Sequence, residues 1–356
     1  MNKKIHEQYL KEKDTYKILG KKMKILIKEL LDMEGINYQS VSCRTKDEKS
    51  FLNKLERKEG KYKDLKEITD ITGIRIITYY SDTVDEVAKI ISEQFEVDNE
   101  NTIDKRKALD PDRFGYLSLH YIVSLNEDRF DLPEYRMFRE IKFEIQIRSI
   151  SQHTWAEIEH DLGYKSEIGI PGEIKRDFCR LAGLLELVDK EFLEIREKLK
   201  DYEKNVEINL ETDKEKIFID NISLKAYIDS NNYILSLNKK ISESFNARLE
   251  KASKSTIENI VNSLKYLGFE TIKDIELEVR KNEEGIYNLA KNILKHSKQE
   301  YIGNQIALGY LCYYKLCELG SIDKFNSFFE DNGFKTNEEF AENLISIYKE
   351  YKKSEN

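Results

Sequence analysis

Two stretches of this chain, Tyr116-Leu117-Ser118-Leu119-His120 and Glu144-Ile145-Gln146-Ile147-Arg148, alternate polar and apolar residues. Alternate residues of a β-strand point to opposite faces of its sheet. The apolar residues of both stretches would therefore face a core, and the polar residues would share the other face. We expect that polar face to hold a polar ligand, with the side chains Tyr116, Ser118, His120, Glu144, Gln146 and Arg148.

The segments around these stretches alternate between helical and strand patterns. Helical spacing of apolar residues predicts helices over 5–34, 47–58, 82–95, 151–162 and 173–204. Gly35 would end the first helix and Asp82 would cap the third. Strands are predicted at 36–44, 73–80, 98–105, 116–125 and 139–149, and a loop at 126–138. This pattern predicts an α+β domain over residues 1–204, in which helices flank a mixed β-sheet.

The pattern changes after about residue 215, where strand signals vanish and Leu, Ile, Tyr, Lys and Glu dominate. We interpret residues 215–356 as a separate, all-helical domain. Its predicted helices cover 221–229, 231–250, 254–267, 272–281, 284–297, 299–319, 321–331 and 336–352. The tyrosines near residue 310 are interpreted as core residues.

Composition narrows the function classes. A length of 356 residues is typical of two domains, and 35% charged residues with a net charge of −8 argue against indiscriminate nucleic-acid binding. No apolar run is long enough to cross a bilayer, and the N-terminus lacks a signal-peptide pattern, so we expect a cytoplasmic protein. Four scattered cysteines without a CxxC pair predict neither a disulfide framework nor a zinc site.

A cationic cluster lies upstream of the polar strand face. Lys46, Ser50, Lys54 and Arg57 are spaced by four, four and three residues and would share one face of a helix that begins near Lys46. Such a face suits a polyphosphate, and it is equally typical of a solvated basic surface.

Asp70 and Arg75 flank the start of a predicted buried strand, where a lone charge is costly unless it is paired or bound to a ligand. They could form a structural ion pair. Alternatively, Asp70 could join Glu144 in holding Mg²⁺, which usually takes one or two carboxylates plus substrate phosphates. Glu144 and Arg148 could likewise form an ordinary cross-strand ion pair. The presence of all these groups beside a cationic helix favours a functional site.

Five clusters in series resemble the RelA/SpoT alarmone synthetase domain. They cover residues 44–165 and are Arg44-x-Lys46-x3-Ser50, Asp70-x2-Gly73-Ile74-Arg75, Gly115-Tyr116-x-Ser118-Leu119-His120, Glu144-Ile145-Gln146-Ile147-Arg148, and Trp155 to His160 followed by Tyr164-Lys165. The resemblance implies a nucleotidyltransferase-like fold. It also implies an enzyme that moves the β,γ-pyrophosphate of ATP to the ribose 3′-hydroxyl of GDP or GTP, with Mg²⁺ as cofactor.

The resemblance also implies roles for single residues. ATP would be held by Arg44, Lys46, Ser50, Lys54, Arg57 and Arg75. Asp70 would bind Mg²⁺, and Glu144 would bind Mg²⁺ or act as the general base. The acceptor site would comprise Tyr116, which stacks on the base, together with His120, Gln146 and Arg148. These residue types suit phosphoryl transfer, which depends on positioning and charge neutralisation.

The sequence departs from the family before Gly115, where Phe114 stands in place of a common asparagine and Asp110 and Asp112 dilute the basic character. This weakens the case for a guanosine acceptor. The alternatives are a toxic small alarmone synthetase, which would modify the tRNA 3′ end or make adenosine alarmones, and an inactive nucleotide-binding module. His160-Asp161 resembles a hydrolase metal pair but lacks the other histidines. The identity of the acceptor, homo-oligomer formation and a regulatory role for residues 215–356 all stay open.

Overall fold

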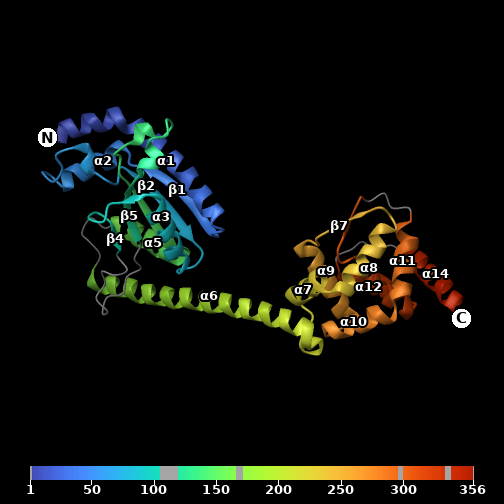
Figure 1. The fold of residues 1–356 in the computed structure, drawn as a ribbon. Coiled ribbons are helices and arrows are strands. Elements are labelled where there is room, and N and C mark those ends of the chain that lie inside the picture. Colours follow the sequence, from blue (N-terminus) through green and yellow to red (C-terminus); the bar gives the residue numbers. More distant parts are fainter. Residues whose placement is uncertain (1, 105–118, 166–170, 296–299, 333–337, 356) are drawn as a thin grey trace. The chain divides into compact units, whose positions relative to one another are not determined.

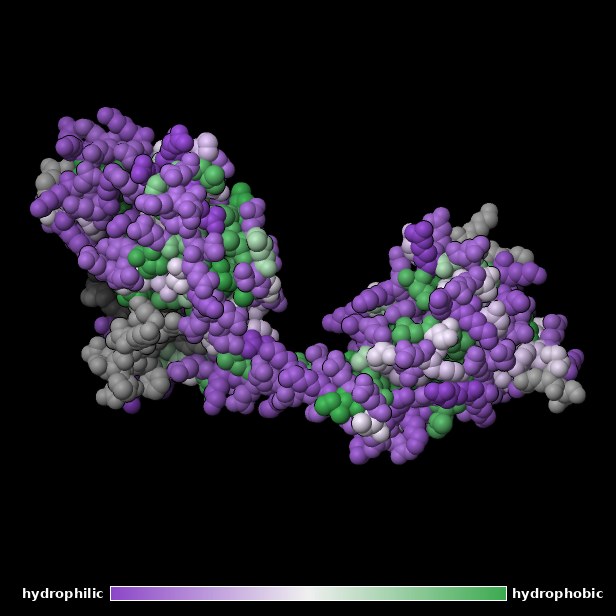
Figure 2. Space-filling view, viewed as in Figure 1, coloured by the Kyte–Doolittle hydropathy of each residue, from purple (hydrophilic) through white to green (hydrophobic). Residues whose placement is uncertain are grey.

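The computed structural model describes residues 2–104, 119–165, 171–295, 300–332 and 338–355 (Figure 1). The chain forms two compact units, Met1–Arg196 and Glu197–Asn356. The division falls inside the long helix α6 (Gly172–Thr212). The visible surface of each unit is largely hydrophilic, as Figure 2 shows.

A mixed β-sheet forms the centre of the first unit, as the alternating patterns predict. Within the described residues it has six strands, in the order β1-β2-β6-β5-β3 with β4 beside β5. The strands are β1 (Tyr38–Thr45), β2 (Thr72–Thr78), β3 (Glu96–Val97), β4 (Ile103–Asp104), β5 (Leu119–Ser124) and β6 (Phe143–Ser149). Strands β2 and β6 are parallel, while β1 and β5 run antiparallel to their neighbours. The predicted strand 98–105 is reduced to the short β4.

The apolar face of the sheet packs against helices α1 (Asn2–Met33) and α3 (Thr83–Gln94). Ile145 and Ile147 of β6 are fully buried there, as the alternation predicts. Gly35 ends α1 in a left-handed conformation (φ 68°), in which the amide of Ile36 donates to the carbonyl of Leu31. Helix α1 thus covers one face of the sheet and leaves the polar face open.

A smaller core fixes the cationic segment before the polar cleft. Helix α2 (Glu48–Arg57) buries Phe51, whose ring stacks on that of Tyr9 from α1 with centroids 4.0 Å apart. The Tyr9 hydroxyl donates to the backbone carbonyl of Lys46 at 2.6 Å. Asp47 caps α2 through its side chain, so Lys46 lies before the helix. The 3₁₀ helix η1 (Leu65–Glu67) completes this segment.

Two local expectations in the first unit were wrong. The predicted loop 126–138 contains α4 (Glu127–Phe130) and the 3₁₀ helix η2 (Arg136–Phe138), which buries Phe138 in the main core. Asp82 precedes α3, but its side chain makes no capping hydrogen bond to the helix and pairs with Arg196 of α6 instead. In both places a tertiary contact outweighs the local sequence preference.

Helices α5 (Ile150–Lys165) and α6 follow the last strand. The Ser149 hydroxyl, at the end of β6, donates to the buried carboxylate of Asp189 at 2.9 Å and so attaches α6 to the sheet. Helix α6 extends about two turns beyond the predicted end at residue 204.

The second unit is largely helical, as expected, with a single core of Leu, Ile, Tyr and Phe residues. Beyond α6 and the 3₁₀ helix η3 (Lys214–Lys216), its helices are α7 (Asn221–Ser230), α8 (Asn232–Glu243), α9 (Lys254–Tyr266), α10 (Ile272–Lys281), α11 (Glu283–Leu294), α12 (Ile306–Leu319), α13 (Ile322–Asp331) and α14 (Glu338–Glu355). The expectation of an all-helical unit needs one correction, because β7 (Arg248–Glu250) and β8 (Tyr301–Gly303) form a two-stranded parallel sheet. Across the described helices, we find none with the length and apolar character needed to cross a membrane.

Candidate active site

The polar face of the sheet opens into a cavity of about 300 Å³. Its lining comes from strands β1, β2 and β6, from helices α2 and α5, and from the segments just before α2 and β2. The lining residues are Ser42, Arg44, Lys46, Ser50, Asp70, Gly73, Ile74, Arg75, Glu144, Gln146 and Glu157. The parallel register places Gly73 beside Glu144 and Arg75 beside Gln146. Strand alternation therefore gathers these groups, as the sequence predicts.

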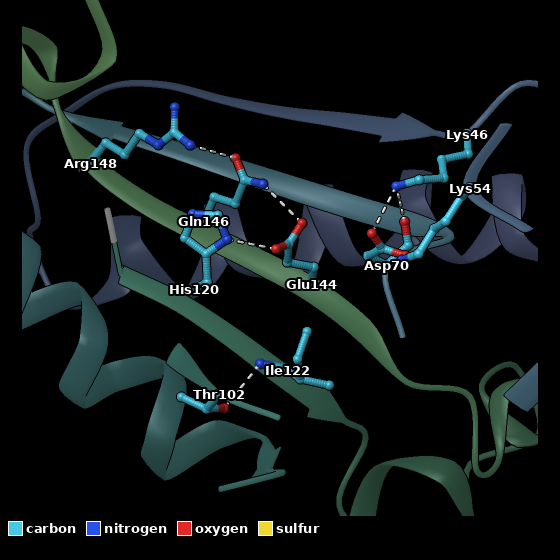
Figure 3. A network of polar contacts seen from close by, with 9 residues as sticks. All are labelled: Lys46, Lys54, Asp70, Thr102, His120, Ile122, Glu144, Gln146 and Arg148. Carbon is cyan, nitrogen blue, oxygen red and sulfur yellow. Dashed lines mark hydrogen bonds and ion pairs between the residues drawn. The ribbon is translucent and has the colours of Figure 1, made fainter. Parts of the chain in front are cut away.

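A chain of hydrogen bonds crosses the polar face around Glu144 (Figure 3). His120 Nδ1 lies 2.7 Å from Glu144 Oε1, and Gln146 Nε2 donates to Glu144 Oε2 at 2.8 Å. Arg148 Nη2 donates in turn to Gln146 Oε1 at 3.2 Å. The sequence analysis left open a direct ion pair between Glu144 and Arg148. In the structure, the amide of Gln146 bridges these two side chains.

The Glu144 carboxylate is held in its ionised form. Its burial raises the pKa, but the hydrogen bond and charge of His120 and the hydrogen bond of Gln146 outweigh burial and leave the pKa lowered. The nearby charge of Asp70 opposes this effect. Two negative side chains therefore lie close enough to influence each other at the cleft.

Asp70 is held by two lysines (Figure 3). Lys46 Nζ donates to Asp70 Oδ2 at 3.0 Å and to the Asp70 carbonyl at 2.9 Å, and Lys54 pairs with Asp70 Oδ1. Burial raises the pKa of Asp70, but the charges and hydrogen bonds of Lys46 and Lys54 leave it below its usual value. The sequence analysis left open an ion pair between Asp70 and Arg75. In the structure, Asp70 pairs with Lys46 and Lys54 instead.

The lowered pKa of Asp70 predicts a pH-dependent contribution to stability. A carboxylate with a lowered pKa in the folded state stabilises the protein above its unfolded pKa, and this contribution is lost as the pH falls through the folded pKa. Asp70→Asn should therefore lower the free energy of unfolding of the first unit at pH 7, and the deficit should shrink as the pH falls below about 3.9, the ordinary pKa of an unfolded aspartate. Urea unfolding followed by the fluorescence of Trp155, the one tryptophan of the sequence, measures this in the first unit.

The exposed Asp128 provides the matched control, since Asp128→Asn makes the same chemical change away from the cleft. A deficit for Asp70→Asn that stays the same from pH 7 to below about pH 3.9 would contradict the role given to the lysine pairs.

Glu157 is the residue that our sequence interpretation left without a role. It projects from α5 into the cleft, where its Oε1 lies 2.9 Å from Arg75 Nη1. Burial and the charge of Arg75 lower the pKa of His153, one turn earlier on α5, and also that of Arg148. Glu157 thus offsets the positive charge at this end of the cleft. The sequence feature that could have identified Glu157 as a site residue is its position within the cluster from Trp155 to His160.

The predicted site residues fall into three groups. Seven line the cleft, namely Arg44, Lys46, Ser50, Asp70, Arg75, Glu144 and Gln146. Three more contact these through hydrogen bonds or ion pairs, namely Lys54, His120 and Arg148. Arg57 is exposed near the end of α2, away from the lining, and Tyr116 lies outside the described residues.

This arrangement can bind a polyphosphate between Arg44, Lys46, Lys54 and Arg75, and it keeps two ionised carboxylates, Asp70 and Glu144, at the cleft. In the part of the chain that the structure describes, no group of three or more His, Cys, Asp or Glu side chains is placed to hold a metal ion. Asp70 and Glu144 together suit a cation whose remaining ligands come from bound phosphates and water.

Part of this chain is similar to known proteins. Residues 43–169 match the family model described as the region found in RelA / SpoT proteins, which confirms the resemblance of residues 44–165. The chain is 29% identical over 205 residues to the GTP pyrophosphokinase YwaC of Bacillus subtilis (strain 168), covering 55% of this chain and 94% of that relative. It is 29% identical over 157 residues to the GTP pyrophosphokinase YjbM of the same organism, which covers 44% of this chain and 71% of that relative. The crystal structure of the small alarmone synthetase 1 from Bacillus subtilis is 25% identical, with a TM-score of 0.46, covering 55% of this chain and 99% of that one.

Proposed function

We propose that this protein transfers the β,γ-pyrophosphate of ATP to the ribose 3′-hydroxyl of GDP or GTP. Its residues 43–169 form a RelA/SpoT-type alarmone synthetase region. Two relatives that it resembles over this region are GTP pyrophosphokinases. The observation that supports the proposal best is the pair of ionised carboxylates, Asp70 and Glu144, at a cleft lined by cations.

The cations would bind the triphosphate of ATP. Arg44 and Arg75 lie on neighbouring strands and reach the cleft from one side, while Lys46 and Lys54 reach it from the segment around α2. Bound phosphates would compete with Asp70 for the two lysines and with Glu157 for Arg75. Binding of ATP would thereby release the Asp70 carboxylate.

The reaction needs a base at the attacking hydroxyl. The acceptor 3′-oxygen forms a bond to the β-phosphorus of ATP, the bond from that phosphorus to the α,β-bridging oxygen breaks, and AMP leaves. Glu144 accepts the hydroxyl proton, a transfer typical of a positioned carboxylate. His120 and Gln146 hold both oxygens of Glu144 and so fix its orientation. Glu144 and Asp70 are therefore proposed as the catalytic pair.

Asp70 and Glu144 are also the residues that would hold Mg²⁺. Both are ionised and both line the cleft, which fits the preference of this ion for carboxylate oxygens combined with substrate phosphates. When bound, the ion would neutralise charge that develops on the transferred group.

The acceptor defines the experiment that tests this function. Purified protein, Mg²⁺ and γ-labelled ATP are incubated separately with GDP, GTP, AMP, ADP and deacylated tRNA, and the products are resolved by chromatography. We expect label on GDP or GTP. Label only on tRNA or on adenosine nucleotides would overturn the guanosine assignment, and label on none of the acceptors would favour the inactive module.

Three further expectations from the sequence stay predictions. They are the stacking of Tyr116 on the acceptor base, a cytoplasmic location, and a regulatory role for residues 215–356. Formation of a homo-oligomer stays a prediction as well.

A further inference from the structure

Helix α6 carries a row of exposed apolar side chains in addition to the face that it buries. The helix is continuous over 41 residues, as Figure 1 shows. It packs against the first unit through side chains such as Ala182 and Asp189, which are buried. Beside this packed face, five large apolar side chains are each 37–51% exposed, namely Leu181, Phe192, Ile195, Leu199 and Tyr202.

The row follows a seven-residue repeat. In a heptad written abcdefg, Phe192 and Leu199 occupy a positions, and Leu181, Val188, Ile195 and Tyr202 occupy d positions. We call these six residues the apolar seam. Apolar a and d positions sustained over three heptads are the pattern of a coiled coil. The apolar seam ends at Tyr202, because Val206 at the next a position is buried in the core of the second unit.

The amount of exposed surface indicates that the apolar seam is covered by a partner. Five large side chains at about half exposure leave roughly 500 Å² of apolar surface in one row. Contiguous patches of this size often mark interaction sites on proteins. A straight row with a and d spacing matches the shape of one further helix.

The charges that flank the apolar seam select the partner. Glu191 and Lys198 occupy g positions, and Arg196 and Glu203 occupy e positions. In a parallel coiled coil, a g residue faces the e residue five positions later on the partner helix. A second copy of this chain would therefore pair Glu191 with Arg196 and Lys198 with Glu203. Arg196 already pairs with Asp82 of its own chain, so Glu191 would extend that ion pair.

The antiparallel alternative is disfavoured by the same charges. Full overlap of two antiparallel seams places Phe192 opposite Tyr202 and Ile195 opposite Leu199. In that register Arg196 meets Arg196 of the second copy, and Lys198 meets Lys198. Like charges that face each other across an interface oppose association. The charge pattern is thus complementary to itself only in the parallel orientation.

We propose that α6 binds a second copy of this chain through the apolar seam, in a parallel and in-register coiled coil. The proposal gives the predicted homo-oligomer a surface and an orientation. It does not depend on the synthetase activity.

Sedimentation velocity of the full-length protein, at about 10 μM and about 0.15 M salt, tests the surface. We expect the wild type to have the mass of at least two chains. Ile195→Glu combined with Leu199→Glu should weaken association about 100-fold or more and yield single chains. The matched control combines Leu187→Glu with Ile208→Glu. These residues are 53% and 59% exposed on α6 outside the apolar seam, so the control should sediment as the wild type does.

Two further variants test the orientation. Lys198→Glu should weaken association, and adding Glu203→Lys should restore it, because the exchanged charges attract again across the parallel interface. Leu199→Cys places two introduced thiols at one a layer of a parallel pair, so mild oxidation should give a covalent dimer. The wild type, with its four native cysteines, and Ile208→Cys should not cross-link under the same conditions.

A wild type that sediments as single chains would overturn the proposal and leave the apolar seam to a different partner. Equal masses of the wild type and the variant of Ile195 and Leu199 would also overturn it, since the assembly would then use another surface. An assembly in which Glu203→Lys restores nothing, or Leu199→Cys does not cross-link, would contradict the parallel orientation.

Discussion

Glu144→Gln is expected to lower kcat for pyrophosphate transfer by about 10²–10⁴-fold, the range of a general base. The change keeps the shape of the side chain and one oxygen beside His120, but it removes the ionised group that would accept the 3′-hydroxyl proton. Affinity for ATP should be unchanged or higher, because a negative charge near the phosphates is lost. Steady-state rates and equilibrium ATP binding, measured on the same preparation, separate the two effects.

The competing interpretation makes Glu144 a structural acceptor for His120 and Gln146. On that interpretation, Glu144→Gln would reduce stability and leave kcat within about tenfold of the wild type. Glu134→Gln is the matched control, because Glu134 is exposed in the segment before β6. A rate for Glu144→Gln similar to that of this control would remove Glu144 from the mechanism.

Asp70→Asn is the second change with a large expected effect, a loss in kcat of about 10²–10³-fold. The amide cannot neutralise a metal cation, and Lys46 and Lys54 lose the carboxylate that positions them before ATP binds. We expect the Mg²⁺ concentration for half-maximal rate to rise as well. A titration of rate against Mg²⁺ at saturating ATP measures both quantities.

A purely structural role for Asp70 would leave a different signature. The variant would then be less stable but would keep the kcat and the Mg²⁺ dependence of the wild type. Asp128→Asn again supplies the control for a lost carboxylate outside the cleft.

Periodicity predicted the sheet and the face on which the site lies. Alternation in β6 placed Ile145 and Ile147 in the core and Glu144 and Gln146 on the cleft, because one apolar face fixes the register of a strand. Long amphipathic helices such as α1 were predicted for a similar reason, since one face must be buried.

Side-chain partners were harder to predict, because they depend on tertiary placement. Lys54 and Asp70 were assigned to different ligands, yet they pair with each other in the folded chain. Arg75 meets Glu157 from a helix that follows much later in the sequence. The strands β7 and β8 are three residues each and pair only through the fold of the second unit, so no local pattern marks them.

The central claim is that ATP donates two phosphoryl groups together, through the site around Asp70 and Glu144. The most direct measurement uses ATP labelled separately at the β- and γ-phosphates, with GDP as acceptor and Mg²⁺ present. We predict that both labels enter the guanosine product in equal amounts and that AMP forms in the same amount. Transfer of the γ-label alone, with ADP as the second product, would contradict the account.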